Sequence, residues 1–247
     1  MRLTVIQNVK QLQEMDWCEF TDHLLERDEL EHALGLVDCF WQHDGDMRRP
    51  HAELSAGGCS DTFIDLGTML KKYDGVRALV AWNLIMLIPD DIRSQITRVV
   101  GSDTSATALA GTVAQLLRVK HDRMQKVDDA SGKRQLWLPE NGLISEDDQE
   151  QQVEELTTTG NTPQMVHDGV LAGNPQLTEV RFSPILPMAV DRTMPQVTHV
   201  EGSTIVAIVR YEAHNYLPDN CPLCQAGSPK LRPRKDNNWA LLTGKAA

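Results

Sequence analysis

Hydrophobic and polar positions follow two spacings along the chain, and these predict helices and strands in alternation. Residues 75–87 form an apolar run long enough for a buried helix, and Pro89 ends it. Residues 97–101 predict a short strand, and residues 107–117 predict a helix with its large apolar residues on one side. A strand, a loop and a helix in this order are half of a parallel α/β unit.

The same order returns in the second half of the chain. Residues 149–153 predict a strand, residues 163–173 a helix, and residues 204–209 a clearly apolar strand. We therefore predict an α/β fold in which helices flank a parallel sheet, with ligands bound beyond the carboxyl ends of the strands. One stretch conflicts with this prediction, because residues 149–152 are polar, whereas central strands of parallel sheets are normally continuous apolar runs.

The two ends and one internal segment lie outside this pattern. Residues 1–49 carry leucines and large aromatic residues at roughly helical spacing, which predicts a helical extension that caps the main domain or forms a dimer contact. Residues 120–149 combine charge with Gly and Pro, which predicts a long loop that is either functional or simply solvated. The chain therefore divides into a helical extension (1–49), a main domain (50–227) and a tail (228–247).

Composition narrows the classes of function. The chain has 247 residues and a net charge of −11, with 35 acidic residues against 24 Lys and Arg. This balance argues against a broad nucleic-acid interface, which needs a basic face, but it leaves room for a small phosphate pocket. No apolar run reaches membrane-spanning length, the first residues show no secretory pattern, and five Cys are an odd number for a disulfide framework. We therefore expect a cytoplasmic protein that binds neither nucleic acid nor a membrane.

Candidate chemistry concentrates in residues 152–162. Two adjacent carboxylates, Glu154 and Glu155, precede a hydroxyl-rich loop, and Pro163 then suits the first turn of a helix. The amides and hydroxyls of the loop would converge with the positive helix end on an anion, and the acids beside it would hold sugar hydroxyls or a metal. A phosphorylated sugar fits this arrangement, while an acidic, Thr-rich surface turn is the simpler alternative. The loop residues are Leu156, Thr157, Thr158, Thr159, Gly160, Asn161 and Thr162.

This stretch resembles the phosphoribosyl-pyrophosphate (PRPP) loop of the type I phosphoribosyltransferases, in which a strand ends in two acids before a Thr/Ser/Gly loop. Two further segments resemble the orotate phosphoribosyltransferases of that family. Residues 51–65, which predict a hairpin around a Gly-Gly turn, are similar to an early hairpin of these enzymes. The matching positions there are Leu54, Gly57, Ser60 and Asp61. Near the other end, the run from Cys221 to Cys224 with a following Gly is similar to the C-terminus of one subgroup.

The chain also departs from that family at two places. Gly58 and Cys59 stand where the family carries Lys and His, and this Lys reaches the active site in the family. In the loop after residues 97–101, only Gly101 remains of a Gly-rich sequence that binds pyrophosphate, and Ser105-Ala106 replace its paired Gly. Side chains at these positions crowd a contact between backbone and phosphate.

The resemblance implies a fold, an activity and an assembly. The fold would be a parallel sheet flanked by helices with a small hood, and the assembly a homodimer. The activity would be Mg²⁺-dependent transfer from PRPP to orotate or a similar base, in pyrimidine synthesis. The second hypothesis is a relative that has lost catalysis and binds PRPP or a nucleotide, or acts as an assembly partner.

The resemblance also implies roles for single residues. Glu154 and Glu155 would bind the ribose and support catalysis, and residues 156–162 would hold PRPP. Lys126 would be the catalytic cation of a mobile loop, with Lys133 and Arg134 as alternatives. Each of these three cations is as readily a solvated charge.

Arg192 follows Asp191 after a predicted strand. Its planar guanidinium suits bidentate recognition of a carboxylate or an imide edge, and the resemblance implies that it binds the base. A structural ion pair is the commoner role for such an Arg.

Cys221 and Cys224 suggest half of a zinc site or a redox pair. A structural zinc needs four ligands, and the chain has no second Cys-x-x-Cys. We therefore assign no metal ligand from the sequence. The residues that could complete a site are His214, Cys18, Cys39 and Cys59.

Overall fold

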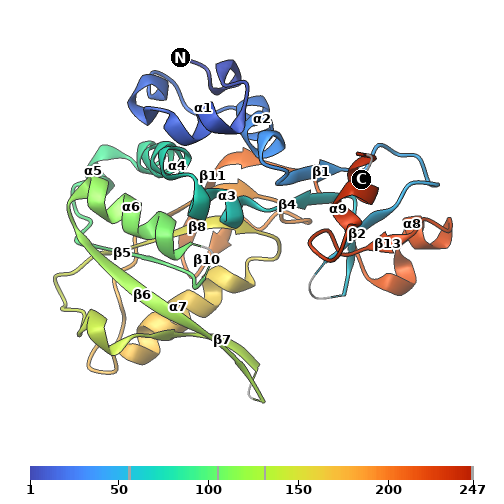
Figure 1. Ribbon diagram of the computed structural model, residues 1–247. Helices are drawn as coiled ribbons and strands as arrows, with labels where there is room; N and C mark the ends of the chain where they lie inside the picture. Colours follow the sequence, from blue (N-terminus) through green and yellow to red (C-terminus); the bar gives the residue numbers. More distant parts are fainter. Residues whose placement is uncertain (55–56, 105, 131, 246–247) are drawn as a thin grey trace.

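A mixed sheet forms the body of the protein (Figure 1). The structure, a computed structural model, describes residues 1–54, 57–104, 106–130 and 132–245. Within these residues, a seven-stranded sheet has the order β10-β11-β9-β8-β5-β6-β7. The strands between the edges run parallel, while β7 and β10 pair antiparallel with their neighbours, so the predicted α/β fold with a parallel sheet is confirmed. The strands are β5 (Arg98–Gly101), β6 (Lys120–Asp129), β7 (Gly132–Trp137), β8 (Glu150–Thr157), β9 (Ile185–Asp191), β10 (His199–Val200) and β11 (Ser203–Arg210).

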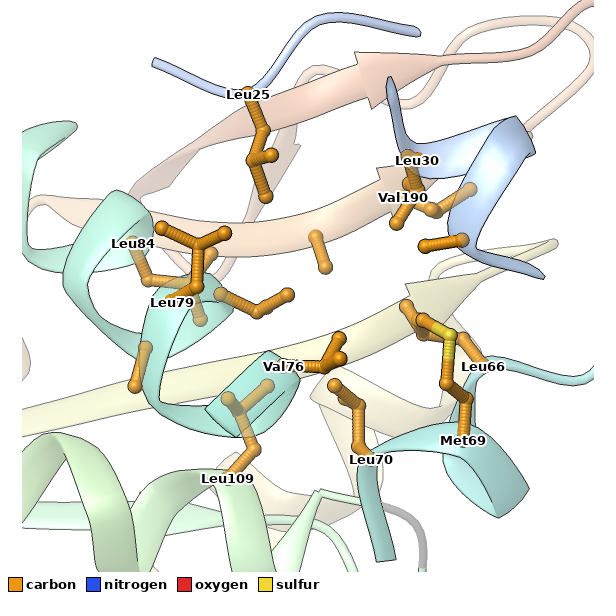
Figure 2. Packing of buried hydrophobic residues seen from close by; sticks show 14 of the residues in the cluster. Leu25, Leu30, Leu66, Met69, Leu70, Val76, Leu79, Leu84, Leu109 and Val190 are labelled. Atoms are coloured by element: carbon orange, nitrogen blue, oxygen red, sulfur yellow. The ribbon is translucent and has the colours of Figure 1, made fainter. Parts of the chain in front are cut away.

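Helices cover both faces of this sheet (Figure 1). On one face, the apolar sides of α3, α4 and α6 pack on the sheet in the main core, which Figure 2 shows around Leu79, Leu109 and Val190. On the other face, Val166 and Val170 of α7 pack against Val100 and Met124. The predicted helix over residues 107–117 has the observed bounds, because its apolar stripe matches the helical period. The helices are α3 (Leu66–Lys72), α4 (Asp74–Met86), α5 (Asp90–Arg93), α6 (Thr107–Leu117) and α7 (Asn161–Gly173).

The polar strand of the sequence is β8, and it does lie in the middle of the sheet. Most of its side chains are buried, and two of the polar ones donate hydrogen bonds to main-chain carbonyl groups. The Gln151 side-chain amide donates to the carbonyl oxygen of Ile185 at 2.8 Å, and the Gln152 amide donates to that of Pro163 at 3.2 Å. Buried polar groups that find such partners are tolerated in a core, which accounts for these two amides. Among the described residues, both carboxylate oxygens of Glu150 and Oε1 of Gln151 find no hydrogen-bond partner, so the conflict with the apolar rule is only partly removed.

Residues 120–129 and 132–137 pair as the two strands of a β-hairpin, and the predicted long loop is therefore wrong for these residues. The charged residues of β6 and β7 hide the strand pattern, because β7 is an edge strand with much of its surface exposed. Two glycines of α7 allow the helix to touch this hairpin. A Cβ added at Gly169 would lie 2.1 Å from the carbonyl oxygen of Gln135, and one at Gly173 would lie 2.3 Å from Cβ of Trp137.

The N-terminal extension is helical up to Leu36 and packs over α4 (Figure 1). Leu25 and Leu30 enter the main core, as Figure 2 shows, and the main-chain N–H of Leu25 donates to Oδ1 of Asn83 at 2.7 Å. The prediction of helices is wrong beyond that point, because β1 (Phe40–Gln42) pairs with β4 (Thr62–Ile64). The helices are η1 (Leu3–Val5), α1 (Val9–Glu14), η2 (Trp17–Phe20) and α2 (Arg27–Leu36).

A second, small sheet lies at one end of the molecule and is called the hood here (Figure 1). Its strand order is β12-β3-β2-β13, and β2 and β3 form the predicted hairpin. Residues 230–231 pair with residues 51–52, so the C-terminal segment joins this sheet. The division of the chain at residues 49 and 227 stays a prediction. The elements are β2 (His51–Glu53), β3 (Cys59–Ser60), β12 (Asn215–Tyr216), η4 (Pro218–Asn220), α8 (Pro222–Gln225), β13 (Lys230–Leu231) and α9 (Asn238–Thr243).

One further short helix, η3 (Pro139–Asn141), follows the hairpin. Among the residues that the structure describes, no helix combines the length and the apolar character needed to cross a membrane.

Candidate active site

A cavity of about 440 Å³ lies where β5 and β8 end beside the β6–β7 hairpin and the start of α7. This is the carboxyl edge of the parallel strands, where ligands of such sheets normally bind. The cavity joins the loops after two neighbouring strands to the hairpin of a third. The lining residues are Ser102, Asp103, Thr104, Lys126, Lys133, Arg134, Gln135, Glu155, Leu156, Thr158, Thr162 and Met165.

The hydroxyl-rich loop after β8 faces this cavity with part of its residues. Leu156, Thr158 and Thr162 line it, and α7 begins at Asn161, so Pro163 lies in the first turn as predicted. The other hydroxyls shape the loop itself. Oγ1 of Thr157 accepts a hydrogen bond from the N–H of Gly160 at 3.0 Å, and Oγ1 of the exposed Thr159 accepts one from the N–H of Asn161 at 3.4 Å.

Gly160 gives this loop its turn. Its φ of +78° is a backbone angle that residues with a side chain rarely adopt. Gly160 immediately precedes α7. The turn directs the start of α7 at the cavity, so the positive helix end faces the same space as the hydroxyls of Thr158 and Thr162.

The two adjacent carboxylates have different surroundings, because neighbouring residues of a strand point to opposite faces. Glu155 lines the cavity. Glu154 is only 1% exposed, and its carboxylate accepts hydrogen bonds from Oγ of Ser102 at 2.6 Å and from Nε2 of Gln152 at 3.1 Å. Burial raises the pKa of Glu154 to about 7, since a buried carboxylate loses its hydration. The structure thus brings only one of the predicted acid pair to the cavity wall.

Three cations of the β6–β7 hairpin reach the cavity: Lys126, Lys133 and Arg134. Arg134 pairs with Asp129 at 2.8 Å, and Lys133 lies 4.0 Å from Asp128. Among the described residues, the exposed Lys126 ammonium has no carboxylate within 4.0 Å. Lys126 is therefore the cation with the least competition for an anionic ligand.

The loop after β5 is tied to the same hairpin. The N–H of Lys126 donates to Oδ2 of Asp103 at 3.0 Å, and the Gln135 side-chain amide bonds both the N–H and the carbonyl group of Asp103, at 3.1 and 2.9 Å. Asp103 and Gln135 are not among the residues predicted from the sequence to form the site. The only signal for Asp103 was its place in the loop after a predicted strand, and Gln135 had none.

Gly101 has a structural role at the end of β5. A Cβ added there would lie 2.9 Å from the carbonyl oxygen of Ala106 and 3.0 Å from Cβ of Ala110, so a side chain would push α6 away from the strand. Of the pair that replaces the family's glycines, Ala106 is buried and its N–H donates to the carbonyl oxygen of Ser102 at 3.0 Å. Ser105 lies outside the described residues.

Arg192 does not line the cavity but lies between the end of β9 and the hood. It is 3% exposed, and Nη2 donates hydrogen bonds to Ser60 Oγ, the Thr62 carbonyl oxygen and Asn215 Oδ1, at 2.9, 3.1 and 3.1 Å. Its buried Nε has no hydrogen-bond partner, and no carboxylate of the described residues lies within 4.0 Å of the guanidinium. Burial lowers the pKa of Arg192, while the more distant charge of Asp61 opposes this effect.

The similarities of this chain to known proteins agree with the geometry of the cavity. No model of a known protein family matches the chain. The orotate phosphoribosyltransferase of Acidithiobacillus ferrooxidans is 25% identical over 199 residues, which are 80% of this chain and 94% of that protein. Among solved structures, the orotate phosphoribosyltransferase of Aeropyrum pernix superposes with a TM-score of 0.54 at 15% identity, covering 74% of this chain and 94% of that one.

The UMP synthase of Leishmania donovani also superposes with a TM-score of 0.54, at 19% identity. That match covers 74% of this chain but only 36% of the larger protein. The chain is therefore similar in sequence to orotate phosphoribosyltransferases over most of its length, and it has their fold. The predicted resemblance to orotate phosphoribosyltransferases is confirmed, whereas the similarity of residues 221–224 to the C-terminus of one subgroup stays a prediction.

Proposed function

We propose that this chain is a phosphoribosyltransferase that transfers ribose 5-phosphate from PRPP to orotate or a similar base. The observation that carries the proposal is the cavity at the carboxyl edge of the sheet, where Glu155, Thr158 and Lys126 meet. An acid, a hydroxyl and a cation around one space match the sugar, phosphate and pyrophosphate of PRPP. The similarity to orotate phosphoribosyltransferases supports the same substrate and a role in pyrimidine synthesis.

The 5-phosphate would bind in the loop after β8. The hydroxyls of Thr158 and Thr162 line the cavity, and the first turn of α7 adds a positive helix end. The remaining loop residues, from Thr157 to Asn161, would act through the turn that they form. This division follows from the internal hydrogen bonds of Thr157 and Thr159.

The acid pair would act on the ribose. Glu155, on the cavity wall, would hold the sugar hydroxyls and stabilise the positive charge that develops at the anomeric carbon. The buried Glu154 would support this role of Glu155 indirectly, through its hydrogen bond with Ser102. Ser102 itself lines the cavity.

Lys126 would stabilise the leaving pyrophosphate, together with Lys133 and Arg134. The oxygen donors on the cavity wall, Asp103 and Glu155, fit Mg²⁺, a hard cation that prefers oxygen ligands and usually binds through one or two carboxylates and substrate phosphates. When bound, Mg²⁺ would neutralise charge on the pyrophosphate.

Arg192 would bind the base. A buried guanidinium with an unpaired N–H and no carboxylate neighbour among the described residues suits a ligand that carries a carboxylate, as orotate does. Ser60 and Asn215 of the hood and Thr62 of β4 would hold the guanidinium in place. A homodimer stays a prediction from the resemblance, and a cytoplasmic location stays a prediction from the composition.

A second candidate function is binding of PRPP or a nucleotide without turnover. The observation that favours it is the burial of Glu154, which makes the acid pair incomplete at the cavity wall. The loss of the hairpin Lys, replaced by Gly58, favours it too.

The test is to incubate the pure protein with PRPP, Mg²⁺ and a panel of bases, and to measure pyrophosphate release. We expect release that depends on orotate and is abolished in Glu155→Gln. Binding of PRPP by calorimetry, without release for any base, would favour the second candidate. No binding and no release would contradict both.

A further inference from the structure

Three cysteines and one histidine meet in the hood, far from the cavity residues in sequence. His51 lies on β2, Cys59 on β3, Cys221 directly before α8 and Cys224 within it. Their ligand atoms all lie within 4.8 Å of one another. His51, Cys59 and Cys221 are buried, and Cys224 is partly buried.

Three distances within this group match the edges of a zinc tetrahedron. With Zn–S bonds of about 2.3 Å and Zn–N bonds of about 2.0 Å, tetrahedral geometry places two sulfur atoms about 3.8 Å apart and a sulfur and a nitrogen about 3.5 Å apart. Sγ of Cys59 and Sγ of Cys224 are 3.6 Å apart. Nε2 of His51 lies 3.3 Å from Sγ of Cys224 and 3.7 Å from Sγ of Cys221.

The hydrogen bonds around His51 orient it as a ligand. Oγ of Ser228 donates to the carbonyl oxygen of Arg49 at 2.6 Å, so it accepts at its contact of 2.8 Å with Nδ1 of His51. The proton of the imidazole is therefore on Nδ1, and Nε2 turns its lone pair toward the sulfur atoms. Histidines that bind metals normally have their other ring nitrogen fixed in this way.

We propose that His51, Cys59, Cys221 and Cys224 bind one Zn²⁺ ion with a structural role. Three sulfur ligands and one nitrogen ligand in tetrahedral positions are typical of zinc, and four protein ligands leave no open position for catalysis. The expectation of no metal ligand from the sequence is revised by this proposal. Of the residues considered there, only Cys59 belongs to the group, and His214, Cys18 and Cys39 lie outside it.

The ion would connect two parts of the chain that are about 160 residues apart. It would clamp the β2–β3 hairpin to the segment around α8, where the apolar cluster of Cys59, Cys221 and Leu223 is small. Ser60, next to Cys59, accepts a hydrogen bond from Arg192, so the same clamp would fix the hood against Arg192. The proposal itself does not depend on the proposed activity.

The test is the metal content of the full chain, purified under reducing conditions, offered excess Zn²⁺ and then dialysed. We expect one zinc per chain by mass spectrometry of the elements. Cys221→Ser and His51→Ala should each lose most of the zinc, whereas the control Cys18→Ser, which changes an exposed Cys outside the group, should keep it. Wild-type protein without zinc, or equal loss in Cys18→Ser, would overturn the proposal.

Cobalt binding to the wild-type chain covers the case in which a variant does not fold. Co²⁺ added to the metal-free protein should give the charge-transfer band of thiolate ligands and the intense visible bands of tetrahedral cobalt, and Zn²⁺ should remove both. A cobalt spectrum without sulfur ligands or with octahedral bands would overturn the proposal.

Discussion

The main-chain N–H of Arg192 donates a hydrogen bond to the carbonyl oxygen of Thr157, at an N···O distance of 3.0 Å. Asp191, the residue before it, is the strand partner of Thr157 in the register of β8 and β9. The residue proposed to hold the base is therefore attached directly to the loop proposed to hold the phosphate. Because both follow neighbouring parallel strands, the sheet fixes their separation more rigidly than two independent loops would.

Thr158→Val should weaken the binding of ribose 5-phosphate. The change keeps the shape of the side chain but removes a hydroxyl that lines the cavity. A hydrogen bond to a charged group contributes roughly 1.5–3 kcal/mol, so the affinity should fall about tenfold to a hundredfold. Calorimetry measures this, with Thr178→Val at an exposed loop position as the matched control. Unchanged affinity in Thr158→Val would remove the phosphate from this loop.

Lys126→Gln should lower kcat/KM for PRPP by about a hundredfold, the loss typical of one donor that stabilises charge in a transition state. The reason is that Lys126 faces the cavity and has no carboxylate within 4.0 Å among the described residues. Initial rates of pyrophosphate release measure the effect. Lys71→Gln, at an exposed position of α3, is the control, and equal activity of both variants would assign Lys126 to the solvated surface.

Arg192→Ala should lower the affinity for orotate about tenfold to a hundredfold, since a charge-assisted contact of roughly 1.5–3 kcal/mol is lost. The affinity for PRPP should change little, because the phosphate loop uses other donors. Titration with each ligand measures the two affinities, and a melting curve measures the stability.

Asn215→Ala is the control for Arg192, because it removes one of its anchors and leaves its charge. We expect it to weaken orotate binding less than Arg192→Ala does. If Arg192→Ala instead reduces both affinities equally and lowers Tm, Arg192 is a structural residue.

Glu154→Gln should stabilise the protein above neutral pH. The pKa of Glu154 is raised from 4.5 to about 7 in the folded protein, so between these values the folded state keeps a proton that the unfolded chain has lost. The free energy of unfolding therefore falls as pH rises through this window, by up to roughly 3 kcal/mol at 1.36 kcal/mol per pKa unit. Gln has no such proton, and it can bond both Ser102 and Gln152.

Urea unfolding of wild type and Glu154→Gln at pH 4.5 and pH 8 tests this prediction. We expect the two proteins to differ little at the lower pH and by up to roughly 3 kcal/mol at the higher one. Glu140→Gln, at an exposed position, should show no such divergence. A constant difference between wild type and Glu154→Gln at both pH values would contradict the buried, protonated state of Glu154.

The sequence predicted a helix or strand correctly where the residues of that element alone define it. The helix over residues 107–117 follows from its apolar period, and the start of α7 near Pro163 follows from the chemistry of a first turn. The β6–β7 hairpin was missed, because its inward residues Met124 and Gln135 are outnumbered by charged neighbours and are buried by α7 rather than by their own pattern.

The sequence by itself determined the alternation of β5, α6, β8, α7 and β11 and the chemistry of the loop after β8, because period, turn residues and side-chain donors are local properties. Only the tertiary structure decided which of two adjacent acids faces the cavity, since strand alternation separates Glu154 from Glu155. It also decided which residues join Cys221 and Cys224, because His51 and Cys59 reach them through sheet pairing and packing between distant segments. Such contacts leave no fixed spacing in the chain, and the folded packing alone brings them together.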